Sequence, residues 1–417
     1  MDGTFHVVGG GLAGLSAALA LADAGRRVVV YEAGPQAGGR CRSYFDRELG
    51  CVVDNGNHLL LSGNRAAFAY IERIGAADTL GGPATPVFPF MDLRDGARWS
   101  LRPSAGRIPW WIFDRRRRVP GTRARDYLAL LALRRPDATA TVADILPPGP
   151  LTDRLMEPLA IAALNTPPKD GLASLLGAVV RETLMRGGGA CLPRLPRDSL
   201  AASLVDPAVA ALRRTGADVH FGHRIARIAT AAERATSLDG PAGSVPLAPE
   251  DAVVLATPPW VSAGLLPGLT VPDAFEAIVN VHFRAGAGHG FVGLVGGIAE
   301  WVFAKPGHVS VTISAANRLA DRPAEALAAA IWPEVRAAMA LMHDAMPDDA
   351  MPPWRVVKER RATFAATLAQ ERRRPGARTA FANLTLAGDW TATGLPATIE
   401  GAIRSGRTAA ELLLGRA

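Results

Sequence analysis

The feature that most constrains the fold lies in the first 32 residues. A β-branched run leads into the turn Gly9-x-Gly11-x-x-Gly14, and an Ala- and Leu-rich stretch follows, which predicts a helix closed by Gly25. A second apolar run then ends in Glu32. This order of strand, glycine turn, helix and acid-tipped strand is typical of an adenine dinucleotide site. The alternative is a glycine-rich turn between a strand and a helix that binds nothing, which would not require the second strand to end in an acid.

Each glycine of this motif has a structural role. One glycine permits the tight turn, one lets the backbone approach a pyrophosphate, and one allows the helix to pack closely on the strand. The first amides of the helix, at Leu12 and Ala13, then face the phosphates with the positive end of the helix dipole. Glu32 is placed to accept the ribose hydroxyls, and an acid at this position argues against a 2′-phosphate on the ligand.

Composition limits the class of protein. The chain has 417 residues, 49% hydrophobic and 20% charged, which predicts a globular protein of two domains or one large composite domain. The net charge of +7 permits an anionic partner such as a membrane surface or nucleic acid but does not choose between them. The three cysteines form no Cys-x-x-Cys pair, which fits a reducing compartment without disulfides or structural zinc. The longest uncharged run, residues 252–272, contains four prolines, so we expect a cytoplasmic protein without a spanning helix.

Two further segments carry ligand-binding chemistry. The loop Gly38-Gly39-Arg40 offers backbone that can approach a ligand and a guanidinium that can take a phosphate. The turn from Asp54 to His58, with Gly56 and Asn57 inside it, follows a predicted strand, and its glycine would let a flat ring lie against the backbone.

Together with the first motif, these segments resemble the FAD-dependent amine oxidase and phytoene desaturase superfamily. The resemblance implies an FAD site built from discontinuous segments, and the chain end supplies the rest: a strand meets Gly388-Asp389, and a helix starts near Thr398. In this superfamily the matching aspartate binds the ribityl chain or the pyrophosphate, and the helix N-terminus faces the flavin N1–C2=O edge. The motifs and the resemblance predict non-covalent FAD contacts from Gly9, Gly11, Leu12, Ala13, Gly14, Glu32, Ala33, Gly38, Gly39, Arg40, Gly56, Asn57, His58, Ile225, Ala256, Gly388, Asp389, Thr398 and Ile399.

The predicted fold is α/β, with a Rossmann-like FAD-binding domain and an inserted, mixed α+β substrate domain. The FAD domain is expected to comprise residues 1–80, 197–260 and 355–417, and the substrate domain residues 81–196 and 261–354. Residues 230–248 are polar and predict a hairpin loop. The pattern Gly288-x-Gly290-x-x-Gly293 also has dinucleotide spacing, but its surroundings predict a pair of strands rather than a second nucleotide site. Electrons for the flavin should therefore come from an external donor.

Three more stretches narrow the resemblance. Residues 157–168, with Asn165-Thr166 followed by two prolines, residues 192–194, and the Asp54–Leu61 segment are similar to the squalene-associated FAD-dependent desaturases, the hydroxysqualene dehydroxylase family of hopanoid biosynthesis. The residues that follow, 62–64, depart from the family pattern, so that loop is less securely matched. The resemblance implies that FADH2 removes the hydroxyl of hydroxysqualene, a long-chain isoprenoid, to give squalene.

This reaction needs a general acid, because hydroxide is a poor leaving group. His58 is the first candidate, with Asp54 as its orienting partner, although both residues could instead only shape the flavin loop. Alternative functions on the same scaffold are a carotenoid or phytoene-type desaturase, an amine oxidase, or a prenyl-lipid carrier. The intact set of Glu32, Arg40 and Asp389 argues against the carrier.

One stretch suggests contact with a membrane. Residues 107–118 pair an aromatic cluster, Trp110–Phe113, with the run Arg115–Arg118, within a putatively membrane-facing segment that spans residues 107–135. Aromatic rings beside clustered cations are suited to an anionic bilayer surface, and no nucleic-acid-binding module accompanies the arginines. A solvated charge run beside a buried tryptophan pair is the alternative. The sequence thus predicts a peripheral protein on the inner face of the cytoplasmic membrane.

Overall fold

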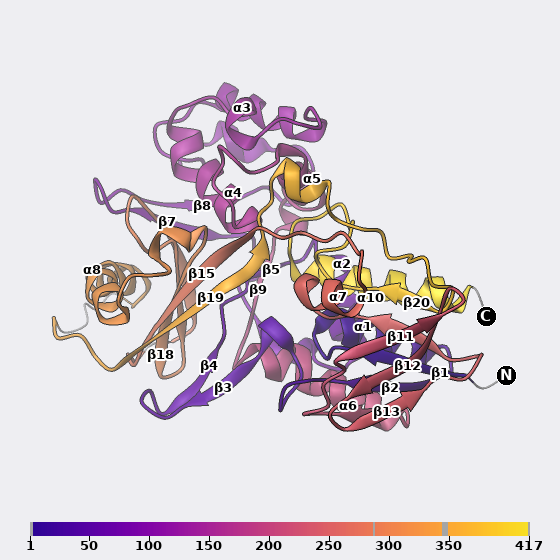
Figure 1. Cartoon of the computed structure of the whole chain (residues 1–417). Coiled ribbons are helices and arrows are strands. Elements are labelled where there is room, and N and C mark those ends of the chain that lie inside the picture. Colours follow the sequence, from indigo (N-terminus) through magenta and orange to yellow (C-terminus); the bar gives the residue numbers. More distant parts are fainter. Residues whose placement is uncertain (1–2, 287, 344–348, 416–417) are drawn as a thin grey trace.

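The computed structural model describes residues 3–286, 288–343 and 349–415. Figure 1 shows a region near the two chain ends that holds β1, β2, α1 and α10, and a second region that holds β15, β18, β19 and α8. Helices α3, α4 and α5 lie together at the top of the view, above the second region.

The first region is built on a five-stranded parallel sheet, which agrees with the predicted Rossmann-like unit. Apart from the edge strand Asp218–His220, its strands are almost entirely buried, as expected when helices cover both faces of a parallel sheet. In spatial order the strands are β10 (Asp218–His220), β2 (Arg27–Tyr31), β1 (Thr4–Val8), β14 (Ala252–Leu255) and β20 (Leu384–Leu386).

Helices from both ends of the chain pack together on this sheet. They are α1 (Leu12–Asp23), α2 (Arg65–Arg73), α6 (Asp206–Arg214) and α10 (Ile399–Leu414). A Cβ added at Gly406 of α10 would lie 2.1 Å from the carbonyl oxygen of Ala13, so the two helices approach closely because Gly406 has no side chain. The buried carboxylate of Glu400 accepts hydrogen bonds from the amides of Ala66 and Ala67, at 3.0 and 2.8 Å, and thereby caps α2.

A small antiparallel sheet occupies the segment that the sequence predicted as a hairpin loop. Its strands are β11 (Arg227–Ala231), β12 (Arg234–Gly240) and β13 (Gly243–Pro246). Ala235 and Leu238, although surrounded by polar residues, are both buried in the cluster that contains Leu255 and Leu386. They are three positions apart, and a register shift in the pairing of β11 with β12 lets both face the core.

The second region is built on a seven-stranded mixed sheet. In spatial order its strands are β19 (Trp354–Phe364), β15 (Phe275–Phe283), β18 (His308–Ile313), β17 (Trp301–Lys305), β16 (Gly290–Val295), β7 (Phe88–Asp92) and β8 (Arg98–Leu101). One face is apolar and packs on α8 (Ala324–His343), with Val279, Val311 and Leu327 fully buried between them.

The pairing of β19 departs from the expected domain boundary. We expected residues from 355 onward to belong to the FAD domain, yet β19 pairs antiparallel with β15 along its length and completes the second sheet. The pairing between strands decides which domain a segment joins, and neighbouring residues in the sequence do not reveal that pairing.

The second glycine pattern forms strands, as predicted. β16 is followed by β17 in an antiparallel pair, with no helix between them. A Cβ added at Gly293 would lie 2.5 Å from the ring of Phe90, so this glycine leaves room for an aromatic ring on the sheet surface rather than for a phosphate.

Short helices cover one end of the second sheet. They are η3 (Trp110–Phe113), η4 (Ala124–Arg134), α3 (Val142–Ile145), η5 (Thr152–Met156), α4 (Glu157–Leu164) and α5 (Ala173–Glu182). Asn165, in the left-handed conformation, ties this cap to the sheet: its amide nitrogen donates to Thr363 Oγ1 at 2.9 Å, and its oxygen accepts from the amide of Ala315 at 2.7 Å.

The remaining elements connect the two regions. They are η1 (Gly39–Cys41), β3 (Ser43–Asp46), β4 (Cys51–Asp54), β5 (Leu60–Leu61), η2 (Ala77–Thr79), β6 (Leu80–Gly81), η6 (Leu184–Arg186), η7 (Gly188–Ala190), β9 (Pro193–Pro196), η8 (Ala201–Val205), α7 (Pro259–Leu265), η9 (Ala316–Leu319) and α9 (Leu368–Glu371). None of the helices in the described part of the chain is long and apolar enough to cross a membrane.

Candidate functional site

The glycine turn between β1 and α1 has the geometry that its three glycines predict. Gly9 has a φ of 112°, and a Cβ there would lie 2.5 Å from the carbonyl oxygen of Ala256. A Cβ at Gly14 would lie 1.9 Å from the carbonyl oxygen of Gly9, so the helix packs tightly onto the turn. A Cβ at Gly11 would meet no atom within 4 Å. Gly11 is therefore the open position where the backbone can meet a pyrophosphate.

Glu32 lies at the end of β2, over this turn. One carboxylate oxygen accepts from the amide of Gly10 at 2.8 Å, and the other accepts from the amide of Gly34 at 2.6 Å. A carboxylate has about four acceptor positions, so these two bonds hold Glu32 in place and leave capacity for ribose hydroxyls.

The loop at Gly38 lies directly against the glycine turn. The Gly38 amide donates to the carbonyl of Gly10 at 2.8 Å, and a Cβ at Gly39 would lie 3.5 Å from Cα of Gly11. Both loop glycines have positive φ, of 109° and 56°, which explains why glycine occupies both positions.

Arg40 joins this loop to the chain end. Its guanidinium donates to Asp389 at 2.7 Å and to the carbonyl of Ala362 at 2.6 Å. The Arg40 side chain is 42% exposed, whereas that of Asp389 is 7% exposed, so Arg40 lies at the surface of the site beside a carboxylate that is fixed in the protein. The structure therefore unites the predicted residues of the first 40 positions with those near 389.

Arg374, which the sequence reading did not single out, fixes the loop that carries Asp389. Its side chain is fully buried and donates to the carbonyl of Asp389 at 3.1 Å, to Thr393 Oγ1 at 2.8 Å and to Glu371 at 2.7 Å. It lies in a run of three arginines, which reads as a solvated charge cluster, so the sequence offered no signal that this one is buried.

The predicted helix start is confirmed at the other side of the site. Thr398 is the N-cap of α10 and accepts from the amide of Gly401 at 3.0 Å. Ile399 and Ile225 are largely buried, at 8% and 6% exposure, and the Ala256 amide donates to Val8 at the end of β1.

Asp54 does not orient His58 through a hydrogen bond, contrary to the sequence expectation. One oxygen of the buried Asp54 carboxylate accepts from Ser43 Oγ at 2.6 Å and from the Leu200 amide at 2.8 Å, and the other forms an ion pair with Lys305. The Lys305 ammonium at the end of β17 is a stronger partner for a buried carboxylate than a neutral imidazole, because it neutralises the charge.

Polar side chains of the second sheet form hydrogen bonds with the turn that follows Asp54. Asn57 donates to Ser310 Oγ at 2.6 Å and to Thr312 Oγ1 at 3.1 Å. Asn280 donates to the carbonyl of Asn55 at 3.0 Å and accepts from Thr312 at 2.8 Å, and Ser310 bonds His282 Nδ1 at 2.8 Å. We call Asn280, His282, Ser310 and Thr312 the polar strip.

His58 is only partly buried and is neutral at pH 7. Burial lowers its pKa to about 4; the charge of Asp54 opposes this with the next largest effect, and the positive charges of Arg40 and Lys305 add smaller effects in the same direction as burial. A neutral imidazole can donate a hydrogen bond but holds no surplus proton near pH 7.

Glu300, which directly precedes β17, has a pKa that is shifted upward. Burial raises its pKa to about 7, against hydrogen bonding from Ser314, whose amide donates to the carboxylate at 2.7 Å. The residue as a whole keeps an intermediate solvent exposure.

Aromatic rings cover the same sheet face beside the polar strip. The Phe90 ring lies 5.5 Å from those of both Trp99 and Trp301, and the Phe291 ring lies 6.1 Å from Phe88 and 6.2 Å from Trp301. We call this set the aromatic wall; its members are Phe88, Phe90, Trp99, Phe291, Trp301 and Phe303.

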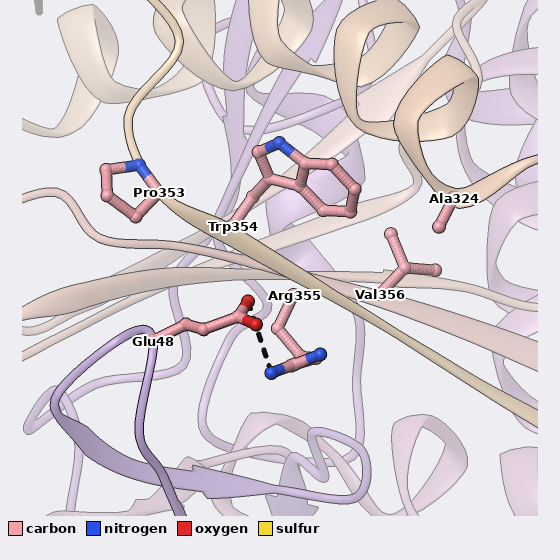
Figure 2. A pocket seen from close by; sticks show the side chains of 6 residues that line it. All are labelled: Glu48, Ala324, Pro353, Trp354, Arg355 and Val356. Carbon is pink, nitrogen blue, oxygen red and sulfur yellow. Dashed lines mark ion pairs between the residues drawn. The ribbon is translucent and has the colours of Figure 1, made fainter.

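A surface cavity of about 560 Å³ lies elsewhere, beside the β3–β4 hairpin (Figure 2). Its walls include Glu48, Trp354 and Arg355, and Figure 2 shows the ion pair between Glu48 and Arg355, whose closest atoms are 3.2 Å apart. Arg355 also pairs with Asp46 at 2.6 Å. None of the predicted flavin residues lines this cavity, so it is not the flavin site.

Metal and thiol chemistry find no support among the described residues. No group of three His, Cys, Asp or Glu side chains in that part of the chain could hold a metal ion. Cys41 is buried beside the loop at Arg40, and burial raises its pKa to about 12, so its thiol is protonated and a poor nucleophile.

A parallel Rossmann-type sheet, a glycine turn with an acid-tipped second strand, and a chain end that closes the site define a flavoprotein oxidoreductase. The sequence profile of the flavin-containing amine oxidoreductases matches residues 12–287 and 299–414. Solved structures of low sequence identity share the fold. A putrescine oxidase variant superposes with a TM-score of 0.70 at 14% identity, covering 99% of both chains. Cyclohexylamine oxidase from Brevibacterium oxydans gives 0.65 at 16% identity, covering 100% of this chain and 99% of its own.

Full-length relatives narrow the class further. The chain is 51% identical to hydroxysqualene dehydroxylase of Rhodopseudomonas palustris, with 100% of both chains covered, and 48% identical to that of Sinorhizobium fredii, with 99% of both covered. The relative from Zymomonas mobilis is 46% identical over 98% of each chain. The chain therefore belongs to the hydroxysqualene dehydroxylase family, within the flavin-containing amine oxidoreductases.

Proposed function

We propose that this protein uses reduced FAD to remove the hydroxyl group of hydroxysqualene and release squalene. The observation that carries the proposal is the full-length match to relatives of this name at about half identity. The bound flavin supplies a hydride, and the protein supplies binding, orientation and a proton for the departing oxygen.

The residues around the turn at 54–58 have separate tasks in this proposal. Two sets of contacts hold the turn in position beside the proposed flavin ring: the ion pair of Asp54 with Lys305, and the hydrogen bonds between Asn57 and the polar strip. His58, neutral at pH 7, donates a hydrogen bond to the departing oxygen.

FAD is proposed to bind without a covalent bond. Cys41 is protonated, and the other cysteines, Cys51 and Cys191, also have raised pKa values because burial disfavours the thiolate. Precipitation of the protein with acid should release all of the yellow colour. Colour that stays with the precipitate would contradict this part of the proposal.

Turnover tests the main proposal directly. Purified holoprotein, reduced with dithionite under anaerobic conditions, should convert hydroxysqualene to squalene with one squalene formed per flavin oxidised. Oxidised protein mixed with squalene or phytoene should form no desaturated product. Desaturation without dehydroxylation would favour the carotenoid-desaturase alternative, and a colourless protein that binds prenyl lipid would favour the carrier.

His58 has a test of its own. His58→Ala should lower kcat by about 10²-fold while flavin content stays intact, and kcat of the wild type should show no titration of this group between pH 6 and 8. If flavin content falls in parallel with activity, His58 only shapes the flavin loop.

We also propose that the cap binds the surface of an anionic membrane, from which the isoprenoid enters. Trp110 and Phe113 of η3 are each 65% exposed, and Ile108 is 58% exposed. Leu128 and Leu131 of η4, which the sequence reading passed over, are 63% and 56% exposed. Trp111, by contrast, is 3% exposed and packs on Tyr127, so one tryptophan anchors η3 and the other projects.

The charge beside these residues fits the same surface. The run Arg115–Arg118 directly follows η3, and each basic residue near an anionic bilayer contributes about 1 kcal/mol. Replacing the four arginines with glutamine should abolish co-sedimentation with anionic vesicles and leave flavin content unchanged. The matched control replaces four arginines outside the cap, at 47, 65, 213 and 214; equal loss in both variants would show that only net charge matters.

We propose that the flavin is reduced by a molecule other than this protein. The region around Gly288-x-Gly290-x-x-Gly293 is a strand pair, so an external electron donor is expected to reduce the flavin.

A further inference from the structure

One edge of the second sheet carries a cluster of cations. β19 stands at the end of this sheet in spatial order, and its partner there is β15. The second half of β19 and the segment around η9 together present five basic side chains, of which four are exposed and one, Lys358, is half-buried. We call this set the basic edge; its members are Arg318, Arg322, Lys358, Arg360 and Arg361.

Contacts between the two segments join the basic edge into one surface. The Lys358 ammonium donates to the carbonyl of Arg322, and Arg360 donates to the carbonyl of Ala320 at 3.2 Å. Arg360 also forms an ion pair with Asp321 at 2.7 Å. Among the described residues, the other four members of the basic edge form no ion pair. The surface therefore keeps a positive charge that an acidic partner can neutralise.

An irregularity in β19 lies within this surface and next to the flavin residues. Ala277 of β15 alone lies opposite residues 360–362, so this part of β19 bulges from the sheet. The carbonyl of the last residue of the bulge accepts from Arg40 at 2.6 Å. Glu359, just before the bulge, lies 3.7 Å from Arg42, so its charge is balanced outside the basic edge. The two arginines of the bulge thus project beside the loop that is predicted to hold flavin.

An exposed tryptophan adjoins these cations. Trp260 in α7 is 39% exposed, and its ring centroid lies 5.1 Å from that of Phe275. The Arg361 guanidinium lies over the Trp260 ring at 4.8 Å from the centroid. Tryptophan and arginine are enriched at the positions that contribute most to the affinity of protein interfaces. The surface thus combines an aromatic anchor with surrounding charge, which suits a protein partner.

We propose that the basic edge and Trp260 dock an acidic electron-carrier protein that reduces the flavin. This inference rests on the proposed function, in which the flavin needs an external donor. Two reduced one-electron carriers give one electron each, and solvent supplies two protons, so FAD becomes FADH2 and both carriers are oxidised. The surface cavity in Figure 2 includes no member of the basic edge, and the cations are spread over an exposed strand edge, so the surface fits a protein better than a nucleotide donor.

Binding between oxidised proteins tests the surface without turnover. The probe is an acidic bacterial flavodoxin that carries a fluorophore, and its anisotropy is followed as oxidised holoprotein is added. The test variant removes four cations of the basic edge: Arg318→Gln, Arg322→Gln, Lys358→Gln and Arg361→Gln. It should bind at least about 10-fold more weakly than the wild type and lose most of the salt dependence between about 0.05 and about 0.5 M.

The matched control removes the same charge elsewhere on the surface: Arg47→Gln, Arg65→Gln, Arg213→Gln and Arg214→Gln. It should bind the flavodoxin nearly as the wild type does. Flavin content and circular dichroism confirm that each variant is folded. If the test variant does not fold, the double variant Arg322→Gln and Lys358→Gln carries the charge test.

Trp260→Ser tests the aromatic contact separately. It should weaken binding by about 10-fold and leave the salt dependence unchanged, because it removes no charge. Phe221→Ser is the matched control, since Phe221 is 36% exposed and also lies beneath an arginine, Arg213, at 5.8 Å. It should bind as the wild type does.

The rate of flavin reduction separates this inference from the proposed reaction. Reduced flavodoxin should reduce the flavin of the test variant at least about 10-fold more slowly than that of the wild type, whereas dithionite should reduce both at similar rates. Failure of the wild type to bind flavodoxin, equal effects of the test and control variants, or direct reduction by NADPH without a carrier would overturn the inference. If dithionite-reduced protein converts hydroxysqualene but flavodoxin does not dock, the reaction stands and the docking surface fails. If flavodoxin docks and reduces the flavin but hydroxysqualene is not converted, the surface stands and the reaction fails.

Discussion

Single side chains at this site derive their properties from what surrounds them. Asp54 and Glu300 are both carboxyl groups deep in the protein, yet Asp54 forms an ion pair with Lys305, whereas Glu300 is hydrogen bonded by the amide and the side chain of Ser314. Burial raises the pKa of Glu300 to about 7, against these hydrogen bonds and the charge of Arg318. The same logic makes His58 neutral, because burial and neighbouring cations both disfavour its protonated form.

Glu32 should control flavin affinity. Glu32→Ala removes a charged acceptor from the ribose position, and hydrogen bonds to charged groups contribute roughly 1.5–3 kcal/mol each. We expect FAD affinity to fall by at least about 10-fold for each bond lost, measured as flavin retained after dialysis. Glu48→Ala, at the rim of the surface cavity, is the control and should retain flavin; full retention by Glu32→Ala would exclude the ribose contact.

Glu300 should make stability depend on pH. Between pH 4.5 and 7 the folded protein binds more protons at this site than the unfolded chain, so its contribution to stability falls as the pH rises through that range. Glu300→Gln removes the cost of a buried charge. Urea unfolding should therefore show the variant gaining roughly 2–3 kcal/mol on the wild type between pH 5 and pH 8. A difference that does not change with pH would contradict the raised pKa.

At the scale of elements, glycines decide how closely helices and strands approach. α1 and α10 come from opposite ends of the chain, and the N-terminus of each lies at one side of the proposed flavin site. Their contact depends on Gly406, just as the aromatic wall depends on Gly293.

Gly406→Ala should therefore separate the two helices. The added methyl would meet the Ala13 carbonyl at 2.1 Å, and overpacking of this kind costs about 1–3 kcal/mol. The expected result is a lower unfolding free energy together with weaker flavin binding. Gly264→Ala is the matched control: it lies in α7 with no atom within 4 Å of the added Cβ, and should be neutral or stabilising by up to about 1 kcal/mol. Equal effects of the two substitutions would show that the helix contact tolerates a side chain.

At the scale of the molecule, a buried polar layer joins the flavin-side turn to the second sheet. The ion pair of Asp54 with Lys305 and the hydrogen bonds of Asn57 cross from one region to the other. His282 and His308 lie in the same layer, 0% and 3% exposed, and burial lowers their pKa values to about 3 and about 4.

Acid should therefore lower the free energy of unfolding through the two buried histidines of this layer. Below about pH 6.5 the unfolded chain binds protons at both histidines that the folded protein does not, so stability is lost as the pH falls towards 4. Each histidine should cost about 2 kcal/mol between pH 7 and pH 5. Replacing both with glutamine, which retains an acceptor for Ser310, should flatten the pH dependence of urea unfolding. An equally steep dependence in the double variant would place the acid sensitivity elsewhere.

The sequence by itself determined the dinucleotide unit, because its requirements are local: a φ of 112° at Gly9, room at Gly14 and an acid at the end of β2 are encoded within 32 residues. It also predicted that Asp389 and the helix after Thr398 would return to the site, through resemblance rather than through any local rule.

The tertiary structure alone decided the rest. The partner of Asp54 is 251 positions away, Arg374 is buried in a run that reads as exposed, and β19 joins the second sheet by pairing with β15. The boundary between the aromatic wall and the polar strip exists only in the register of β17 and β18, since neither strand contains both kinds of side chain at adjacent positions on one face. Contacts between distant segments set ionisation, burial and strand order, and these depend on the folded arrangement rather than on neighbouring residues.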